Sequence, residues 1–364
     1  MTFGQLTQWF NTKFPLALQE SYDNAGLIVG DPRTEITGIL VTLDCKEEII
    51  DEAISKGCNF LIAHHPIIFK GIKKINGKNY IERTVIKAIK NDIGILALHT
   101  NVDNHFNGVN RKMAELLNLQ DVQILQPLEN KLVKLSVFIP NDVVTVVSNA
   151  IFEAGGGEIG NYSECSFQIK GRGTFTPNEN AHPFIGEVHQ RTLTEETKTE
   201  FLVQSYNIGK VVTAMKNAHP YEEVAYEMYP LLNENQFEGA GMIGELTTPI
   251  NALDFLKLVK QTFKCGLIRH TALLDKPIQK VAVCGGSGSF LLTKAKQQKA
   301  DIFISSDFKY HEFFDAENEI IIADIGHYES EQFTSILLAD TIKENFTKFA
   351  VHLTEINTNP INYF

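Results

Sequence analysis

Two segments that lie far apart in the 364-residue chain repeat one pattern, in which an apolar strand, a helix-like stretch and a second apolar strand follow one another. A further helix-like stretch and a third strand continue each copy. The predicted strands are 39–44, 60–63 and 93–98 in the first copy and 280–284, 301–304 and 319–323 in the second. Strands that alternate with helices form largely parallel sheets. The chain is therefore predicted to be an α/β protein with two pseudo-symmetric halves.

A different pattern separates the two halves. Strands are predicted at 134–139, 166–175, 199–203 and 223–229, and helices at 142–154 and 208–218. Their order, βαββαβ, is that of ferredoxin-like domains. We therefore expect an α/β half at 1–129, an inserted ferredoxin-like domain at 130–235 and a second α/β half at 236–364.

The net charge and the cysteine pattern indicate which partners and which cellular environment to expect. The formal net charge of −11 argues against broad nucleic-acid binding, which needs a basic surface. The five cysteines include no Cys-x-x-Cys pair and are typical of reduced thiols. The first residues do not have the pattern of a signal peptide, and no apolar run is long enough to span a bilayer. We expect a cytoplasmic protein without a membrane partner; its acidic charge disfavours nucleic acids as partners, and DNA binding through a ring channel is the weaker alternative.

Two adjacent histidines interrupt the apolar stretch FLIAHHPIIF at 60–69. Pro66 has no N–H group for a sheet, so the strand ends before it and leaves His64 and His65 at the strand end. Open α/β sheets bind ligands at such ends. By itself, a histidine pair is also typical of two polar residues in a loop.

Further polar residues follow other strands of the repeat. His327 and Glu331 are four residues apart, so on a helical turn they share one face and form half of a metal site. The alternative is a solvated first turn, in which the helix dipole favours Glu331. Asp103 follows the strand at 93–98 and is either a turn residue or a ligand.

Taken together, three histidines and two carboxylates exceed what one four-coordinate structural metal needs. They favour two divalent ions bridged by a carboxylate, for which Asp103 is the candidate. Mixed histidine and carboxylate ligands suit Zn, Mn, Fe or Co. Candidates for proton transfer or outer support are His99, Asp307 and His311, the last two on one side of the chain if their turn is helical. The glycine-rich stretch 285–288 is either a phosphate cradle or a tight strand-to-helix turn.

Several short motifs resemble the NGG-interacting factor three (Nif-three-like) family, many bacterial members of which are called GTP cyclohydrolase 1 type 2 homologs. The matching motifs are 23–27 (DNAGL), 64–66 (HHP), 100–103 (TNVD), 285–288 (GGSG), 306–311 (SDFKYH) and 326–331 (GHYESE). Residues 157–167 and 218–222 resemble the PII-like or CutA-like module that longer members carry as an insert.

The resemblance implies a dinuclear metal site in a toroidal homohexamer. Its ligands would be His64, His65, Asp103, His327 and Glu331. The expected activity is metal-dependent hydrolysis of a nucleotide or another phosphate-containing small molecule, and the family label points to GTP. The alternative is a non-enzymatic metal-binding scaffold or regulator, in which the insert senses a ligand.

Overall fold

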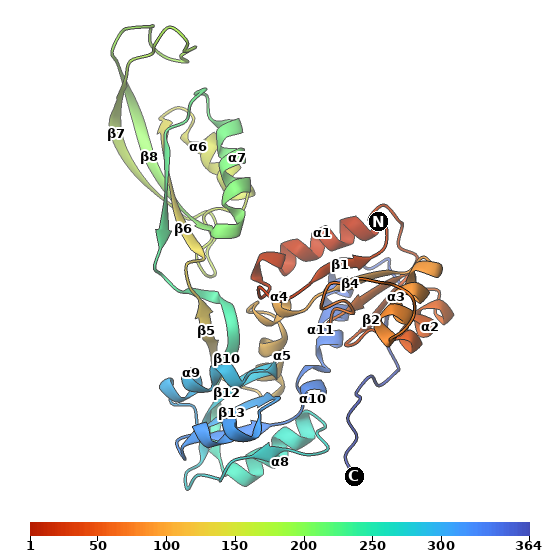
Figure 1. Cartoon of the computed structure of the whole chain (residues 1–364). Helices are drawn as coiled ribbons and strands as arrows, with labels where there is room; N and C mark the ends of the chain where they lie inside the picture. The colour runs from red at the N-terminus through yellow and green to blue at the C-terminus, as the bar shows by residue number, and fades with distance from the viewer. The chain divides into compact units, whose positions relative to one another are not determined.

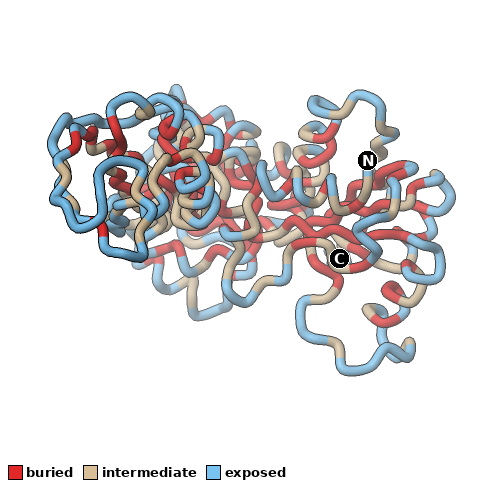
Figure 2. Tube along the Cα trace, turned by 90° about the horizontal axis from the view of Figure 1, so that it is seen from above, coloured by how far each residue is buried: buried red, intermediate tan, exposed pale blue.

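Three β-sheets organise the chain, which a computed structural model describes over residues 1–364 (Figure 1). The chain divides into two compact units, one made of residues 1–126 with 238–364 and the other of residues 127–237. Figure 2 shows buried stretches in the interior of the chain trace and exposed stretches at its periphery. None of the helices combines the length and the apolar character that a membrane crossing requires.

The first sheet of the larger unit has five strands in the order β1-β4-β3-β2-β15. Their bounds are β1 Gly26–Val29, β2 Ile39–Thr42, β3 Phe60–Ala63, β4 Gly94–Ala97 and β15 Val351–Leu353. All neighbours are parallel except β1, which runs antiparallel to β4. Every residue of β2, β3 and β4 is buried, as expected for parallel strands with helices on both faces.

Helices cover both faces of this sheet. On one face α1 (Phe3–Lys13) and α11 (Thr334–Asn345) share a core with the strands, and on the other face α2 (Glu47–Ser55) and α3 (Tyr80–Lys90) do so. Asn79 caps α3 by accepting a hydrogen bond from the backbone N–H of Glu82. The short helices η1 (Leu16–Leu18) and α4 (Thr100–Asp103) complete this half.

The second sheet repeats the strand order of the first: β11-β14-β13-β12 corresponds to β1-β4-β3-β2, and β10 and β5 extend it. The bounds are β5 Gln120–Leu128, β10 Asn235–Ile250, β11 Arg269–His270, β12 Ile278–Ser287, β13 Ile302–Ser306 and β14 Ile321–Asp324. Strands β12, β13 and β14 are parallel, and β11 is antiparallel to β14. The mixed α/β architecture with two similarly ordered sheets agrees with the sequence pattern.

Helices α5 (Val109–Leu116) and α8 (Ala252–Thr262) pack on one face of the second sheet, and α9 (Leu292–Gln297) packs on the other. The remaining short helices of this half are η3 Ser289–Leu291, η4 Tyr310–Ala316 and α10 His327–Glu331. Among the strands that were not predicted is β15, which comes from the C-terminal part of the chain and pairs with β2 of the first sheet. The two α/β halves therefore share a strand as well as a core.

The smaller unit contains one four-stranded antiparallel sheet in the order β7-β8-β6-β9. Its elements are β6 Leu132–Pro140, α6 Val144–Glu153, β7 Ser166–Phe175, β8 Thr192–Gln204, η2 Ser205–Asn207, α7 Ile208–Ala218 and β9 Tyr226–Leu231. The main elements follow the predicted order βαββαβ, although β8 begins seven residues before the predicted strand at 199–203. Helices α6 and α7 pack together on one face of the sheet.

Candidate metal centre

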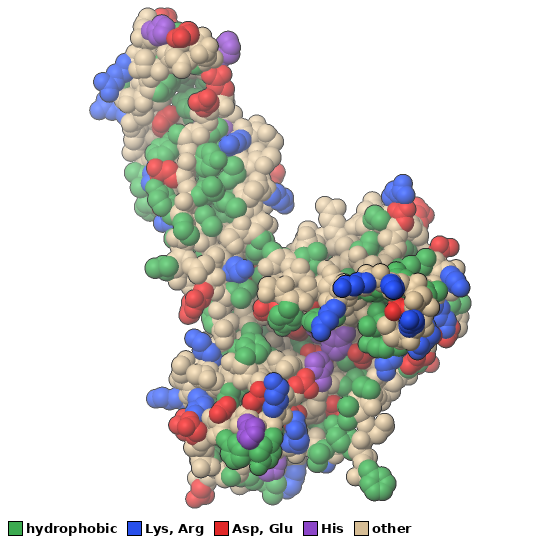
Figure 3. All heavy atoms as spheres, viewed as in Figure 1, with side chains coloured by type: hydrophobic (Ala, Val, Ile, Leu, Met, Phe, Trp, Pro, Cys, Tyr) green, Lys and Arg blue, Asp and Glu red, His purple; other side chains and the backbone are tan.

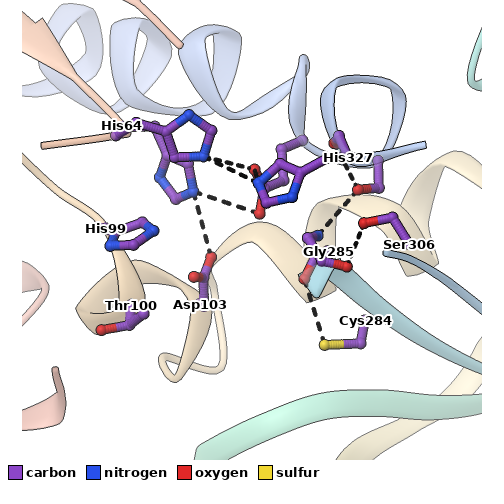
Figure 4. Close-up of polar contacts among 12 residues, drawn as sticks. His64, His99, Thr100, Asp103, Cys284, Gly285, Ser306 and His327 are labelled. Atoms are coloured by element: carbon purple, nitrogen blue, oxygen red, sulfur yellow. Dashed lines mark hydrogen bonds and ion pairs between the residues drawn. The ribbon is translucent and has the colours of Figure 1, made fainter. Parts of the chain in front are cut away.

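The ends of strands from both sheets of the larger unit supply one group of polar side chains (Figure 4). His64 and His65 follow β3, Asp103 ends the short helix after β4, and His327 and Glu331 begin and end α10 after β14. Neighbouring side chains at a strand end point in different directions. As a result His64 lies beside Asp103, whereas His65 lies beside His327.

Glu331 contacts all three imidazoles and lies between them. Its Oε2 is 2.9 Å from Nε2 of His65 and 3.0 Å from Nε2 of His327, and its Oε1 is 3.8 Å from Nε2 of His64. Three groups in the structure have the donor spacing that a metal ion needs: His64–Asp103–Glu331, His65–His327–Glu331 and His64–His65–His99. Glu331 is the carboxylate that two of these groups share, so it is a second candidate, beside Asp103, for a carboxylate that bridges two ions.

Two buried polar atoms at the centre have no hydrogen-bond partner, namely Nε2 of His64 and Oδ1 of Asp103. They lie 3.6 Å from each other, and the His64 side chain is completely buried. A buried polar atom without a partner costs about 1–3 kcal/mol, so folded proteins rarely leave one. The donor chemistry and this pair both fit a bound cation, which would accept electron pairs from the nitrogen and the oxygen.

An outer set of acceptors orients each imidazole through its other nitrogen. Nδ1 of His64 is 2.7 Å from the backbone oxygen of Leu98, which accepts its hydrogen bond. In the same way His65 donates to Asp44, at 2.8 Å, and His327 donates to Asp307, at 2.6 Å. Such bonds fix the tautomer and direct Nε2 to the centre, as is usual for metal-binding histidines.

The charges at the centre shift the pKa values in opposite directions. Burial alone would raise the pKa of Glu331, but the charge and hydrogen bond of His327, with those of the other imidazoles, hold it well below its usual value. Burial and then the charge of Glu331 raise the pKa of Asp103 to about 8. The charge of Glu331 raises the pKa of His327 to about 11. Burial opposes protonation of His65, yet Asp44 and Glu331 raise its pKa to about 9.

These shifts predict that metal binding releases protons. Without metal, His65, His327 and Asp103 all hold a proton at pH 7, because each pKa lies above 7. Metal ligands must be deprotonated, so zinc titrated into metal-free protein at pH 7 is expected to displace roughly three protons per chain. The number follows from the calorimetric enthalpy in buffers of different ionisation enthalpy. It should fall at pH 10, and an enthalpy independent of the buffer at pH 7 would contradict the prediction.

The three candidates for proton transfer differ in position. His99 lies beside the metal group, with its ring centre 5.3 Å from that of His64 and 5.5 Å from that of His65. Its Nδ1 donates to Asp23, 2.7 Å away, which also accepts hydrogen bonds from the backbone and hydroxyl of Thr100. Although Asp23 is buried, these hydrogen bonds, the one from His99 first, lower its pKa to about 2.

Asp307 and His311 are not brought together. Asp307 lies in the left-handed region (φ 60°) and Lys309 is extended, so the helical turn that would align Asp307 with His311 does not form. The 3-10 helix η4 begins only at Tyr310, and His311 is exposed on it. Asp307 instead bonds His327, where it supports a candidate ligand.

The glycine-rich turn after β12 packs against the carboxylate of Glu331. A Cβ atom on Gly286 (φ +61°) would lie 2.3 Å from Oε1 of Glu331, so a glycine is required there. The N–H groups of Gly285 and Gly286 already donate to Asn110 and Ser330, respectively. Of the two readings of this stretch, the tight turn fits better than the phosphate cradle.

The sequence analysis did not identify two residues that support the candidate metal ligands, Asp44 and Thr358. Asp44 follows β2 at the same sheet edge as His65, and that position was an available signal. Thr358 gave none, because it lies in an irregular segment near the C-terminus. Its buried hydroxyl donates to Oδ2 of Asp44 at 2.5 Å, and its backbone oxygen accepts from Lys46 at 2.8 Å.

Thr358→Val is expected to weaken metal binding about tenfold, because it removes the hydrogen bond that holds Asp44 against His65. Competition with a chromophoric chelator measures the affinity. Thr358→Ser keeps the hydroxyl and serves as the matched control. Equal affinities for the valine and serine variants would show that Thr358 does not position His65.

Comparisons with known proteins agree over nearly the whole chain. The family model described as Duf34/NIF3 (NGG1p interacting factor 3) matches residues 1–360. A protein of Halalkalibacterium halodurans named GTP cyclohydrolase 1 type 2 homolog is 38% identical, with 98% of this chain and 97% of that protein covered. A Staphylococcus epidermidis protein of the same name is 34% identical, with 100% of both covered. The crystal structure of a Bacillus cereus protein related to NIF3 superimposes with a TM-score of 0.88 at 35% identity, covering 100% of this chain and 99% of that chain.

Proposed function

Because the chain belongs to the Duf34/NIF3 family, we propose that it is a dinuclear metal protein that hydrolyses a nucleotide or another phosphate-containing substrate. One divalent ion would bind His64, Asp103 and Glu331, and a second would bind His65, His327 and Glu331. The main observation in support is that two neighbouring buried atoms, Nε2 of His64 and Oδ1 of Asp103, both lack a hydrogen-bond partner. Ordinary hydrogen bonding leaves this pair unexplained, whereas a cation accounts for it.

The donor set suits Zn, Mn, Fe or Co, since it mixes imidazoles with carboxylates. Two such ions would polarise the bond under attack and lower the pKa of a water molecule. Asp44 and Asp307 hold the imidazoles of His65 and His327 in place throughout. The relatives' name, GTP cyclohydrolase 1 type 2 homolog, makes GTP the first nucleotide to test.

His99 is the proposed proton carrier. Its Nδ1–H donates to Asp23, which leaves Nε2 as the nitrogen that can accept a proton. The imidazolium that forms is stabilised by the carboxylate of Asp23, whose lowered pKa keeps it ionised. Asp307 and His311 remain weaker candidates, since the first supports His327 and the second is exposed.

The smaller unit is proposed to be a ferredoxin-like domain of the PII or CutA type, inserted at 130–235. The support is its element order, βαββαβ, with strand order β7-β8-β6-β9. The family resemblance adds a homohexamer to this proposal, to be checked by the mass of the protein in solution.

The deciding experiment combines metal analysis with turnover. We expect about two metal ions per chain by plasma mass spectrometry, and hydrolysis of GTP or a phosphoester that stops on chelation and returns on adding metal. Failure to take up any metal on titration would refute the proposal. Tight ligand binding without product would instead identify a metal-binding regulator.

A further inference from the structure

A basic segment adjoins the candidate metal centre in a chain that is acidic overall. Residues 66–79, which connect His65 to α3, contain four lysines and no aspartate or glutamate. The four lysines are all exposed, and none of them forms an ion pair: Lys70, Lys73, Lys74 and Lys78. Figure 3 shows Lys and Arg side chains beside the histidines on this face of the larger unit. In a chain whose net charge is −11, a run of four lysines with no acidic residue among them favours an anionic partner.

The segment is fixed at both ends. At its start, the side-chain N–H of Asn24 donates to the backbone oxygen of Ile68 at 2.6 Å. At its end, the carboxylate of Glu82 accepts from the backbone N–H groups of Asn76 and Lys78, both at 3.0 Å. The lysines therefore project from a tethered loop rather than from a free one.

Two exposed aromatic side chains, Phe69 of this segment and Tyr22, lie near His99. Phe69 has its ring centre 6.2 Å from that of His99 and 6.1 Å from that of Tyr22. Tyr22 is 62% exposed and Phe69 43% exposed, although burying large apolar rings is normally favourable. Exposed aromatic faces beside a reactive group are typical of sites that stack a planar heterocycle.

A cavity of about 560 Å³, which His65 and the start of this segment also line, is a less suitable place for an anion. Its walls include the carboxylates of Asp44, Glu47 and Glu48. Of its two cations, Arg83 is paired with Glu47, and Lys46 donates to a backbone oxygen. The lysine segment has no such carboxylates of its own.

We propose that residues 66–79 are the phosphate-binding part of the substrate site, whose ligand is a nucleotide or a similar phosphorylated heterocycle. The phosphate groups bind among Lys70, Lys73, Lys74 and Lys78, and the ring rests against Tyr22 and Phe69. This inference rests on the proposed hydrolytic function, because it places the substrate next to His99 and the metal ligands.

The test compares the binding of GTP and guanosine to the metal-loaded protein by calorimetry. Lys73→Gln with Lys74→Gln is expected to weaken GTP binding at least about tenfold, since each lysine lost removes a charged contact with phosphate. Guanosine binding should not change. The matched control is Lys90→Gln with Lys299→Gln, which removes the same amount of charge. These two lysines precede β4 and β13 and so lie at the ends of the strands opposite to the candidate site. Tyr22→Ala should weaken both ligands.

The proposal is overturned if the two lysine pairs give equal GTP affinity, or if wild-type protein binds GTP no more tightly than guanosine. Metal content is measured on every variant and should equal that of wild type. A normal metal content with unaltered GTP binding would refute this subsite and leave the metal centre intact. Absence of metal in wild-type protein would refute the proposed function separately.

Discussion

Glu331→Gln is expected to lower the affinity for both metal ions by at least about a hundredfold, above the usual effect of an outer ligand partner. The reason is geometric, because Glu331 reaches His64 with one oxygen and His65 and His327 with the other. Metal content by plasma mass spectrometry should fall from about two ions per chain to nearly none. Glu344→Gln, an exposed glutamate on α11, is the control and should keep both ions.

The variant Asp103→Asn distinguishes the two proposed metal-binding positions. Asp103 belongs only to the group with His64 and Glu331, so this variant is expected to lose one ion and keep the other. The metal-free variant should be at least as stable as wild type at pH 7, because a pKa of about 8 means that the folded protein already keeps this carboxyl neutral. Circular dichroism on heating checks the fold. Loss of both ions from Asp103→Asn would show that Asp103, not Glu331, is the shared ligand.

The second large effect concerns proton transfer. His99→Gln is expected to reduce kcat for the metal-loaded protein by about 10²- to 10⁴-fold, the usual contribution of a general acid or base. Metal content should stay at the wild-type level, because His99 is absent from both groups that contain Glu331. His182→Gln, which changes an exposed histidine of the smaller unit, is the matched control and should keep full activity.

Asp23→Asn provides an independent check on His99. It removes the carboxylate that accepts from Nδ1 and so disturbs the tautomer. We expect a loss of kcat in the same direction, with a changed pH profile. If His99→Gln instead removed metal, His99 would be a ligand, in line with its group with His64 and His65.

The sequence predicted the parallel strands and the polar residues at their ends, because both have local signals. An apolar run such as Phe60–Ala63 predicts a buried strand, and the proline after His65 indicates where that strand ends. The two-residue strand β11 has no such signal, and neither does the pairing of β15 with β2 of the other half. Their pairing depends on contacts between residues that are far apart in the chain.

The same distinction applies to the site. His327 and Glu331 could be paired from their spacing, since four residues make one helical turn and α10 is helical. The same spacing failed for Asp307 and His311, because Asp307 adopts a left-handed conformation that breaks the turn. The central position of Glu331 and the contact of Thr358 with Asp44 follow from how the two sheets face each other, which spacing along the chain does not encode.

The division of the centre between two distant parts of the chain sets an order on its assembly. About 220 residues separate Asp103 from His327, so a ribosome needs roughly 10 to 45 seconds to synthesise the second set of donors after the first. During that time His64, His65 and Asp103 would form only part of the proposed site, and such a partial site would favour the most competitive divalent ion, copper. Correct metallation therefore belongs to the finished chain. In the finished chain without metal, the protons on His65 and His327 offset the charge of Glu331 and keep these donors together until ions would replace them.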